Sequence, residues 1–349
     1  MIKGLIKILL TVVLILITAI IYLSTVGIKT DKFNDQIKKS ILEINNKINI
    51  KLSKVTYLLN PYNFSINVKT KNSQILIENS EIDINSIKTN ISLKSLINDQ
   101  LFIDDLQIST AEIKLNDLIL LARIVHNTPQ LFILNSIIKD GSIAADININ
   151  FDNDGKIKNN YEIKGFVKNT RLDLLNKSSI KDLNFSFDIT ENKYSLSKIN
   201  AAFDEIKFNS PFIQIEGKKD LYLIDGTLLN KDQKLEGKDL KLIFGNLPSN
   251  FDIREIEFSS KNNFSFTINK KLKFNDLKVK TTIDLDQLIF IEKSLNLKPF
   301  LPNTKEEIKF ENHKIKIDYS KDQLTIDGNG DVFLTNNIEK ISYVIIRNN

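Results

Sequence analysis

Cysteine is absent from this 349-residue chain, and histidine occurs only twice. Without cysteine, the chain has no disulfide scaffold, no thiolate metal site and no cysteine nucleophile. The two histidines, His126 and His313, are far apart in sequence and belong to no metal-binding or triad motif. The sequence also lacks a glycine-rich phosphate loop. We therefore expect no enzyme activity, no metal site and no cofactor.

The sequence also has no cluster of arginine residues. The net charge of +5 comes from an excess of lysine, and lysines and carboxylates are interspersed along the chain. The four arginines are isolated from one another: Arg123, Arg171, Arg254 and Arg347. Because nucleic-acid binding needs a basic patch, usually with interleaved aromatic residues, we do not expect nucleic acid as a partner.

One long hydrophobic run is present, from Ile8 to Ile28, without a single charge. At about 1.5 Å per residue, a helix of this length spans about 30 Å, the thickness of a bilayer's hydrocarbon core. We expect a single transmembrane anchor that includes the apolar residues Ile8, Leu14, Leu16, Ile20 and Ile28.

The orientation of this anchor follows from its flanks. Lys3 and Lys7 precede the run and predict a cytoplasmic N-terminus, with the remainder in the bacterial periplasm. The alternative is a cleaved signal peptide, whose apolar region is usually about 7–15 residues and ends in an A-x-A-like site. Here the run is longer, and its small residues Ser24, Thr25 and Gly27 form no such site. The pattern favours a single-pass inner-membrane protein, and on either reading the bulk of the chain is exported.

Residues 29–48 have the pattern of an amphipathic helix next to the membrane. Phe33, Ile37, Ile41, Ile44 and Ile48 recur every three or four residues and would share one helix face. Such a helix would lie on the membrane surface or cover the end of the following β structure.

From residue 49 to 349 the apolar period changes to two, which predicts a periplasmic β domain. Short alternating runs separated by polar residues are typical of an antiparallel sheet with one apolar and one wet face. Helical interruptions are expected near 116–126 and 286–297. A sheet this long must twist or curl. The predicted fold is therefore a transmembrane helix followed by an elongated, twisted antiparallel sheet or groove.

Two polar stretches predict turns. Asp154-Gly155 lies between two alternating runs and indicates a hairpin. The surrounding loop is no calcium loop, because Ile163 stands where an EF-hand would have its glutamate. The glycine-rich stretch Asp327–Asp331 is also interpreted as a turn.

Aromatic residues concentrate on the predicted inward face of the second half. The candidate lining residues are Phe185, Phe187, Ile189, Phe203, Phe208, Phe264, Phe266, Ile268 and Phe274. Such a face is either an ordinary closed core or a concave surface open enough to hold acyl chains. Both require the same alternation, so the pattern leaves the choice open.

The arrangement resembles the AsmA-like family, which includes the TamB and YhdP types. The segments that carry the resemblance are the helix Asp31–Ile48, the strand Asn49–Tyr57, the run from Asn60-Pro61 to Phe64-Ser-Ile-Asn-Val, Ile82–Ile97, Leu101–Leu115 and Ile137-Ile-Lys-Asp-Gly-Ser-Ile. Most of the similarity lies in the first 115 residues.

The resemblance implies an inner-membrane anchor, a taco-like β-groove with an apolar interior, and a role in phospholipid movement and outer-membrane assembly. The implied partners are phospholipid acyl chains, the inner membrane, and an outer-membrane or periplasmic protein at the C-terminal end. The alternative hypothesis is a scaffold that binds no lipid and recruits an envelope protein through exposed β-edges. An envelope hydrolase has no candidate site.

Overall fold

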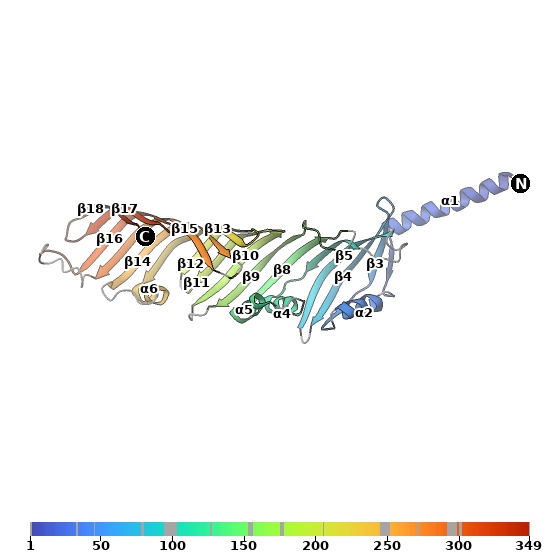
Figure 1. Ribbon diagram of the computed structural model, residues 1–349, viewed down its shortest axis with the longest axis horizontal. Helices are drawn as coiled ribbons and strands as arrows, with labels where there is room; N and C mark the ends of the chain where they lie inside the picture. Colours follow the sequence, from blue (N-terminus) through green and yellow to red (C-terminus); the bar gives the residue numbers. More distant parts are fainter. Residues whose placement is uncertain are drawn as a thin grey trace. The chain divides into compact units, whose positions relative to one another are not determined.

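Figure 1 shows the computed structural model, which describes residues 2–32, 34–44, 46–77, 80–93, 103–125, 128–152, 156–174, 178–204, 206–244, 252–269, 271, 273–291, 299 and 302–348. The chain forms two compact units. The first comprises Met1–Ser136, Asp140–Phe166 and Asp188–Glu191, and the second comprises Ile137–Lys139, Val167–Phe187 and Asn192–Asn349.

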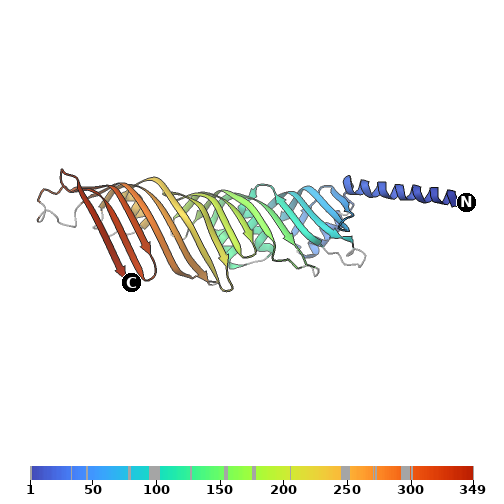
Figure 2. The same cartoon turned by 90° about the horizontal axis from the view of Figure 1, so that it is seen from above.

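The fold is mainly β, as the alternation predicts. Strands account for 67% of the structure, their pairing is antiparallel, and the sheet is open rather than closed into a barrel. Within each unit, strands that follow one another in sequence lie side by side (Figure 2). Antiparallel neighbours need only short connections, so an alternating chain can build such a sheet hairpin by hairpin. The predicted fold class is confirmed.

The N-terminal helix α1 runs from Ile2 to Thr25. Its stretch Ile6–Thr25 is long and apolar enough to cross a membrane, and none of that stretch is buried in the protein. The expectation that the helix reaches Ile28 is wrong, because Ile28 opens strand β1 (Ile28–Thr30) and pairs with Tyr57. Gly27 has a φ of +72°, and a Cβ there would lie 2.4 Å from the Tyr57 carbonyl oxygen. Glycine therefore ends the helix and lets the chain turn into the sheet.

The second helix, α2 (Asn34–Ile44), is shorter than the 29–48 segment predicted for it. Ile48 belongs instead to strand β2 (Ile48–Lys51), where it pairs with Ile77. At its start, the Asn34 side-chain amide donates to the carbonyl oxygens of Leu52 and Ser53, at 3.3 and 3.1 Å. This end of α2 is therefore fixed against the segment that follows β2.

The remaining elements of the first unit form one sheet, with two helices beside the ends of its strands (Figure 1). The strands are β3 (Val55–Asn60), β4 (Ser65–Ile77), β5 (Ser80–Ser92), β6 (Ile103–Thr110), β7 (Ile113–Lys114) and β8 (Ile138–Asn150). The first expected strand, Asn49–Tyr57, is split between β2 and β3.

The helix expected near 116–126 is present as α4 (Leu115–Val125). A second helix, α5 (Pro129–Ile137), follows and was not predicted. Proline suits the first position of a helix, and the Leu131 N–H donates to the Thr128 hydroxyl at 3.3 Å. Thr128-Pro129 therefore lies at the start of α5.

The second unit continues the pattern with longer strands. These are β9 (Glu162–Asp173) and β10 (Ser179–Thr190), which extend into both units, then β11 (Lys193–Phe203), β12 (Ile206–Gly217), β13 (Leu221–Glu236), β14 (Asp252–Asn269), β15 (Phe274–Ile291), β16 (Glu307–Tyr319), β17 (Gln323–Phe333) and β18 (Glu339–Asn348). One helix, α6 (Gly237–Phe244), follows β13. The sequence interpretation missed α6.

The helix expected near 286–297 is wrong in the part that the structure describes. Residues 286–291 are the end of β15, and residues 292–297 lie outside the described ranges. Phe290 pairs with Ile253 on one side and with Ile308 on the other. Two neighbouring strands offer backbone and side-chain partners here, which outweighs a local helical pattern.

The expected glycine-rich turn at Asp327–Asp331 is also wrong, because this stretch lies within β17. A Cβ on Gly330 would lie 2.1 Å from the His313 ring, and one on Gly328 would lie 2.4 Å from the Tyr343 ring. The glycines therefore make room for two rings on neighbouring strands. The turn expected at Asp154-Gly155 and the residue His126 lie outside the described residues.

Replacing Gly330 with alanine is expected to destabilise the protein by about 1–3 kcal/mol, because the methyl group would displace the buried His313 ring. Gly217→Ala is the matched control, since its Cβ would meet nothing closer than 3.5 Å. The urea midpoint of the circular dichroism signal should fall for Gly330→Ala only. Equal midpoints for both variants would contradict this packing.

Candidate functional site

The sheet of the second unit has one face that is mainly apolar. Cross-strand partners point to the same side of a sheet, so the register defines the face. Ile224 pairs with Ile215 on one side and with Phe266 on the other. Farther on, Val279 pairs with both Phe264 and Tyr319. We call the side that carries these residues the apolar face.

Six of the predicted lining residues lie on the apolar face. The register places them there through the pairs Phe203–Ile206, Ala201–Phe208, Gly226–Phe264, Ile224–Phe266, Tyr222–Ile268 and Ile268–Phe274. The other three, Phe185, Phe187 and Ile189, alternate along β10 and so share one face of that strand. The rings of Phe185 and Phe187 are 6.3 Å apart.

Three aromatic rings form a continuous cluster at one end of the apolar face. The ring of Phe266 lies 6.0 Å from that of Phe264 and 5.4 Å from that of Phe274. Gly226 makes room for this cluster, because a Cβ there would be 2.8 Å from the Phe264 ring. Phe274 remains 66% exposed. This end of the apolar face is therefore open.

The opposite end of the apolar face is closed. Phe290, Ile308 and Val332 are buried there. They pack against the partly buried residues Ile253, Phe310, Leu334 and Ile341. Leu240 of α6 is also buried, and this helix begins directly after β13, where Gly237 lies against the Ile253 carbonyl. The end around Phe290 is therefore a closed core, and the end around Phe274 is an open surface.

A band of polar side chains crosses the apolar face between the two ends. The Asn262 amide donates to the Asn230 side-chain oxygen at 3.4 Å and to the Ser260 hydroxyl at 3.0 Å. The Thr281 hydroxyl donates to the Asn262 side-chain oxygen at 2.9 Å. The sequence interpretation missed this band, although polar residues at inward positions of alternating strands would have been its signal.

His313 is the one histidine that the described part of the chain contains, and it is buried in the apolar face with 2% exposure. Its Nε2 donates a hydrogen bond to the Asp331 carbonyl oxygen at 3.1 Å. Its ring also packs 5.5 Å from Phe310 and 6.3 Å from Tyr343. Among the residues that the structure describes, no group of histidine and acidic side chains could hold a metal ion.

The pKa shifts of two residues reflect the different surroundings on the two faces of this sheet. Burial, helped by the nearby Asp327 carboxylate, raises the pKa of the Tyr343 phenol on the apolar face. On the opposite face, hydrogen bonds from Lys234 to Glu257 and Glu255 raise the pKa of this lysine. This charged group of one lysine and two glutamates therefore lies on the solvent-exposed face.

The first unit has a comparable division, with a small pocket on its polar side. The pocket has a volume of about 410 Å³ and is lined by Leu58, Asn60, Asn67, Val68, Lys69, Lys88, Thr89, Asn90, Asp105 and Gln107. The Asp105 carboxylate accepts the Asn90 N–H at 3.0 Å and the Gln107 amide at 3.3 Å. Asp105 is the one carboxylate among these lining residues, so they contain no pair of carboxylates.

The open and closed ends predict different responses to the same substitution in one strand. Phe290→Ala should reduce the free energy of unfolding by about 3–5 kcal/mol, because it leaves a cavity in a packed core. Phe274→Ala should reduce it by less than about 1 kcal/mol, because the ring is mostly exposed. Denaturant unfolding of both variants measures the difference. A large loss for Phe274→Ala would mean that this end is also closed.

Comparisons with known proteins do not indicate a function for this surface. No family model matches the chain, and no curated protein or solved structure matches it. The resemblance to the AsmA-like family therefore rests on the sequence segments quoted above. What the apolar face does has to be argued from its own geometry.

Proposed function

We propose that this chain is a single-pass inner-membrane protein of the AsmA-like type whose β region binds lipid acyl chains. It would contribute to phospholipid transport or outer-membrane biogenesis. The observation that carries the proposal is the open end of the apolar face, where Phe264, Phe266 and Phe274 form a connected aromatic surface. Exposed apolar patches of this kind mark sites that bind apolar partners.

Acyl chains fit this surface by their chemistry. Burial of each CH₂ group contributes roughly 0.8 kcal/mol, so an extended chain gains affinity from a long uncharged surface without any specific contact. The polar band around Asn262 lies beyond the aromatic cluster and could accept or donate hydrogen bonds to a polar part of the lipid. No reaction is needed for this function.

The anchor supports a location at a membrane. The stretch Ile6–Thr25 of α1 suits a spanning helix, and Lys3 and Lys7 favour a cytoplasmic N-terminus. A signal sequence would satisfy the same criteria of length and composition. The β region would lie in the periplasm on both readings.

A scaffold that recruits another envelope protein is a second candidate, favoured by β18. In the part of the chain described, β18 pairs only with β17. Three consecutive apolar residues of this strand are exposed: Val344 by 64%, Ile345 by 52% and Ile346 by 60%. An exposed apolar strand of this kind can accept a further strand from a partner.

Site-specific photo-crosslinking in the full chain tests the two candidates. With a benzophenone amino acid in place of Phe274, we expect phospholipid adducts in native membranes, because this position lies on the open apolar face. Asn275 is the matched control, since the neighbouring residue of a strand points to the opposite face. Mass spectrometry of the purified chain identifies the adducts.

A position in α1, such as Leu14, serves as the positive control for lipid crosslinking. Lipid adducts at Leu14 but none at Phe274 or Phe266 would contradict lipid binding by the apolar face. A protein adduct at Val344, with lipid absent from the apolar face, would favour the scaffold.

A charge on the open face gives a second, independent readout. Phe274→Asp should reduce the lipid adducts formed from position 266 several-fold, because an exposed carboxylate opposes acyl-chain contact. Asn275→Asp adds the same charge on the other face and should leave these adducts unchanged. Equal adduct yields in the two variants would count against binding on this face.

A further inference from the structure

The junction between α1 and the first sheet has a defined geometry. Helix α1 ends at Thr25, and three residues later Ile28 pairs with Tyr57 in the middle of β3. Gly27 lies against Tyr57 and Leu58, where a Cβ would have no room. The C-terminal end of α1 is therefore fixed beside β3 within the first unit.

The turn after β3 returns to this end of α1. Because β1 and β3 are antiparallel, β3 continues from Tyr57 to Asn60 beyond the start of β1, back toward the helix. Three residues of strand extend about 10 Å. The turn of residues 61–64 that follows therefore lies beside the end of α1 (Figure 1). We call it the β3–β4 turn.

The β3–β4 turn presents two aromatic rings to the outside. Tyr62 is 96% exposed and Phe64 is 62% exposed. The backbone of the turn is nevertheless well held. The Asn60 side-chain oxygen accepts the N–H groups of Tyr62 and Asn63 at 3.2 and 3.3 Å, and the Phe64 carbonyl accepts the Leu93 N–H at 2.8 Å.

The conformation of Phe64 adds to this observation. Its φ is +49°, a left-handed conformation that bulky side chains rarely adopt. The turn therefore holds both rings largely outside the packing of the sheet. Exposed aromatic residues beside the end of an apolar helix are typical of a membrane–water interface.

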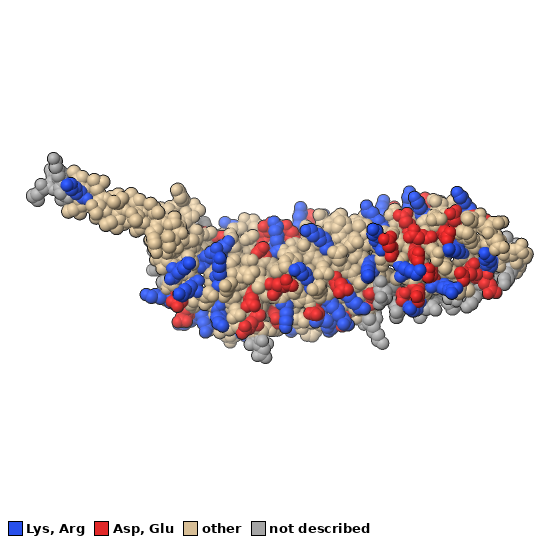
Figure 3. All heavy atoms as spheres, turned by 180° about the vertical axis from the view of Figure 1, so that it is seen from behind, with Lys and Arg blue, Asp and Glu red and all other residues tan. Residues whose placement is uncertain are grey.

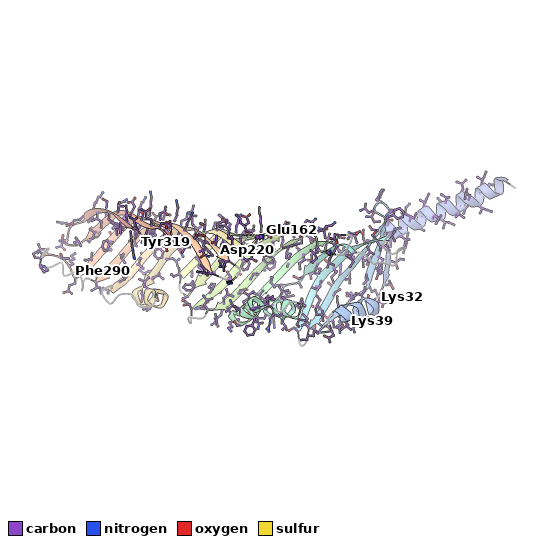
Figure 4. All side chains as sticks on the ribbon, viewed as in Figure 1. Lys32, Lys39, Glu162, Asp220, Phe290 and Tyr319 are labelled. Carbon is purple, nitrogen blue, oxygen red and sulfur yellow. The ribbon has the colours of Figure 1, made fainter. Side chains whose placement is uncertain are left out.

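The segment between β1 and β3 is rich in lysine. Residues 29–54 contain seven lysines, all exposed, and only three acidic residues. We call Lys29, Lys32, Lys38, Lys39, Lys47, Lys51 and Lys54 the basic collar. Figure 4 places Lys32 and Lys39 at the end of the first unit from which α1 leaves, and Figure 3 shows lysine and arginine side chains gathered beside this end. Clusters of basic residues next to a spanning helix attract anionic lipid headgroups.

We propose that the β3–β4 turn and the basic collar together dock the first unit onto the surface of the membrane that α1 crosses. Tyr62 and Phe64 enter the boundary between headgroups and acyl chains, and the basic collar lies over anionic headgroups. The docking holds the sheet at a fixed height on the membrane. It depends on α1 as a membrane anchor but not on lipid binding by the apolar face.

Tryptophan fluorescence tests the docking, because the chain contains no tryptophan. Tyr62→Trp in the full chain, reconstituted in nanodiscs, should be quenched by brominated phosphatidylcholine. Tyr22→Trp, in the last turn of α1, is the positive control. Ile157→Trp is the matched negative control, because Ile157 is 57% exposed and follows β8, at the same strand ends but about 19 Å along the sheet.

Strong quenching at positions 22 and 62, with several-fold weaker quenching at 157, supports the docking. Quenching at 22 but not at 62 overturns it and leaves the turn free for a protein partner. Equal quenching at all three positions also overturns it, because the whole sheet edge would then lie on the membrane.

The contribution of the basic collar is tested in the Tyr62→Trp background. Added phosphatidylglycerol should increase the quenching of Trp at position 62, and the triple variant Lys32→Gln, Lys38→Gln, Lys39→Gln should lose this increase. The pair Lys314→Gln, Lys316→Gln, in β16, is the control and should retain it. Retention by both variants overturns the role of the collar.

Discussion

Strand register is the constraint on which the rest of this structure depends. Each antiparallel hairpin adds one strand and places alternate side chains on the same side as those of its neighbour. The aromatic cluster of Phe264, Phe266 and Phe274, the core around Phe290 and the polar band at Asn262 all exist because this alternation is kept from β11 to β17. A slip of one residue would turn each of them to the wet side.

The register is kept by bulges rather than by uninterrupted alternation. On β13 the apolar face takes the even positions Ile224 to Asn230 and then the odd positions Gln233 and Leu235. Asp232, with a φ of +47°, lies at this shift and donates its N–H to the Ser259 hydroxyl. Asparagine and aspartate tolerate the left-handed conformation better than other residues. Asn312, with a φ of +52°, lies at the corresponding shift of β16.

The two ends of the apolar face connect stability with function. The closed end around Ile308 supplies a packed core, which allows the open end to expose Phe274 without loss of the fold. In the first unit, the proposed docking of the β3–β4 turn would hold the sheet at the surface of the membrane.

The sequence by itself determined the apolar helix, the antiparallel β class and six lining residues of one face, because these follow from local periods of 3.6 and 2. It failed at 286–291 and at Asp327–Asp331, where neighbouring strands and rings outweigh local propensity. The end of α1 at Thr25, the bulges and the division into open and closed ends were decided only by the tertiary structure. All three have the same physical reason. Each depends on which residues of two strands are paired across the sheet, and the local pattern of one strand does not specify its partner or register.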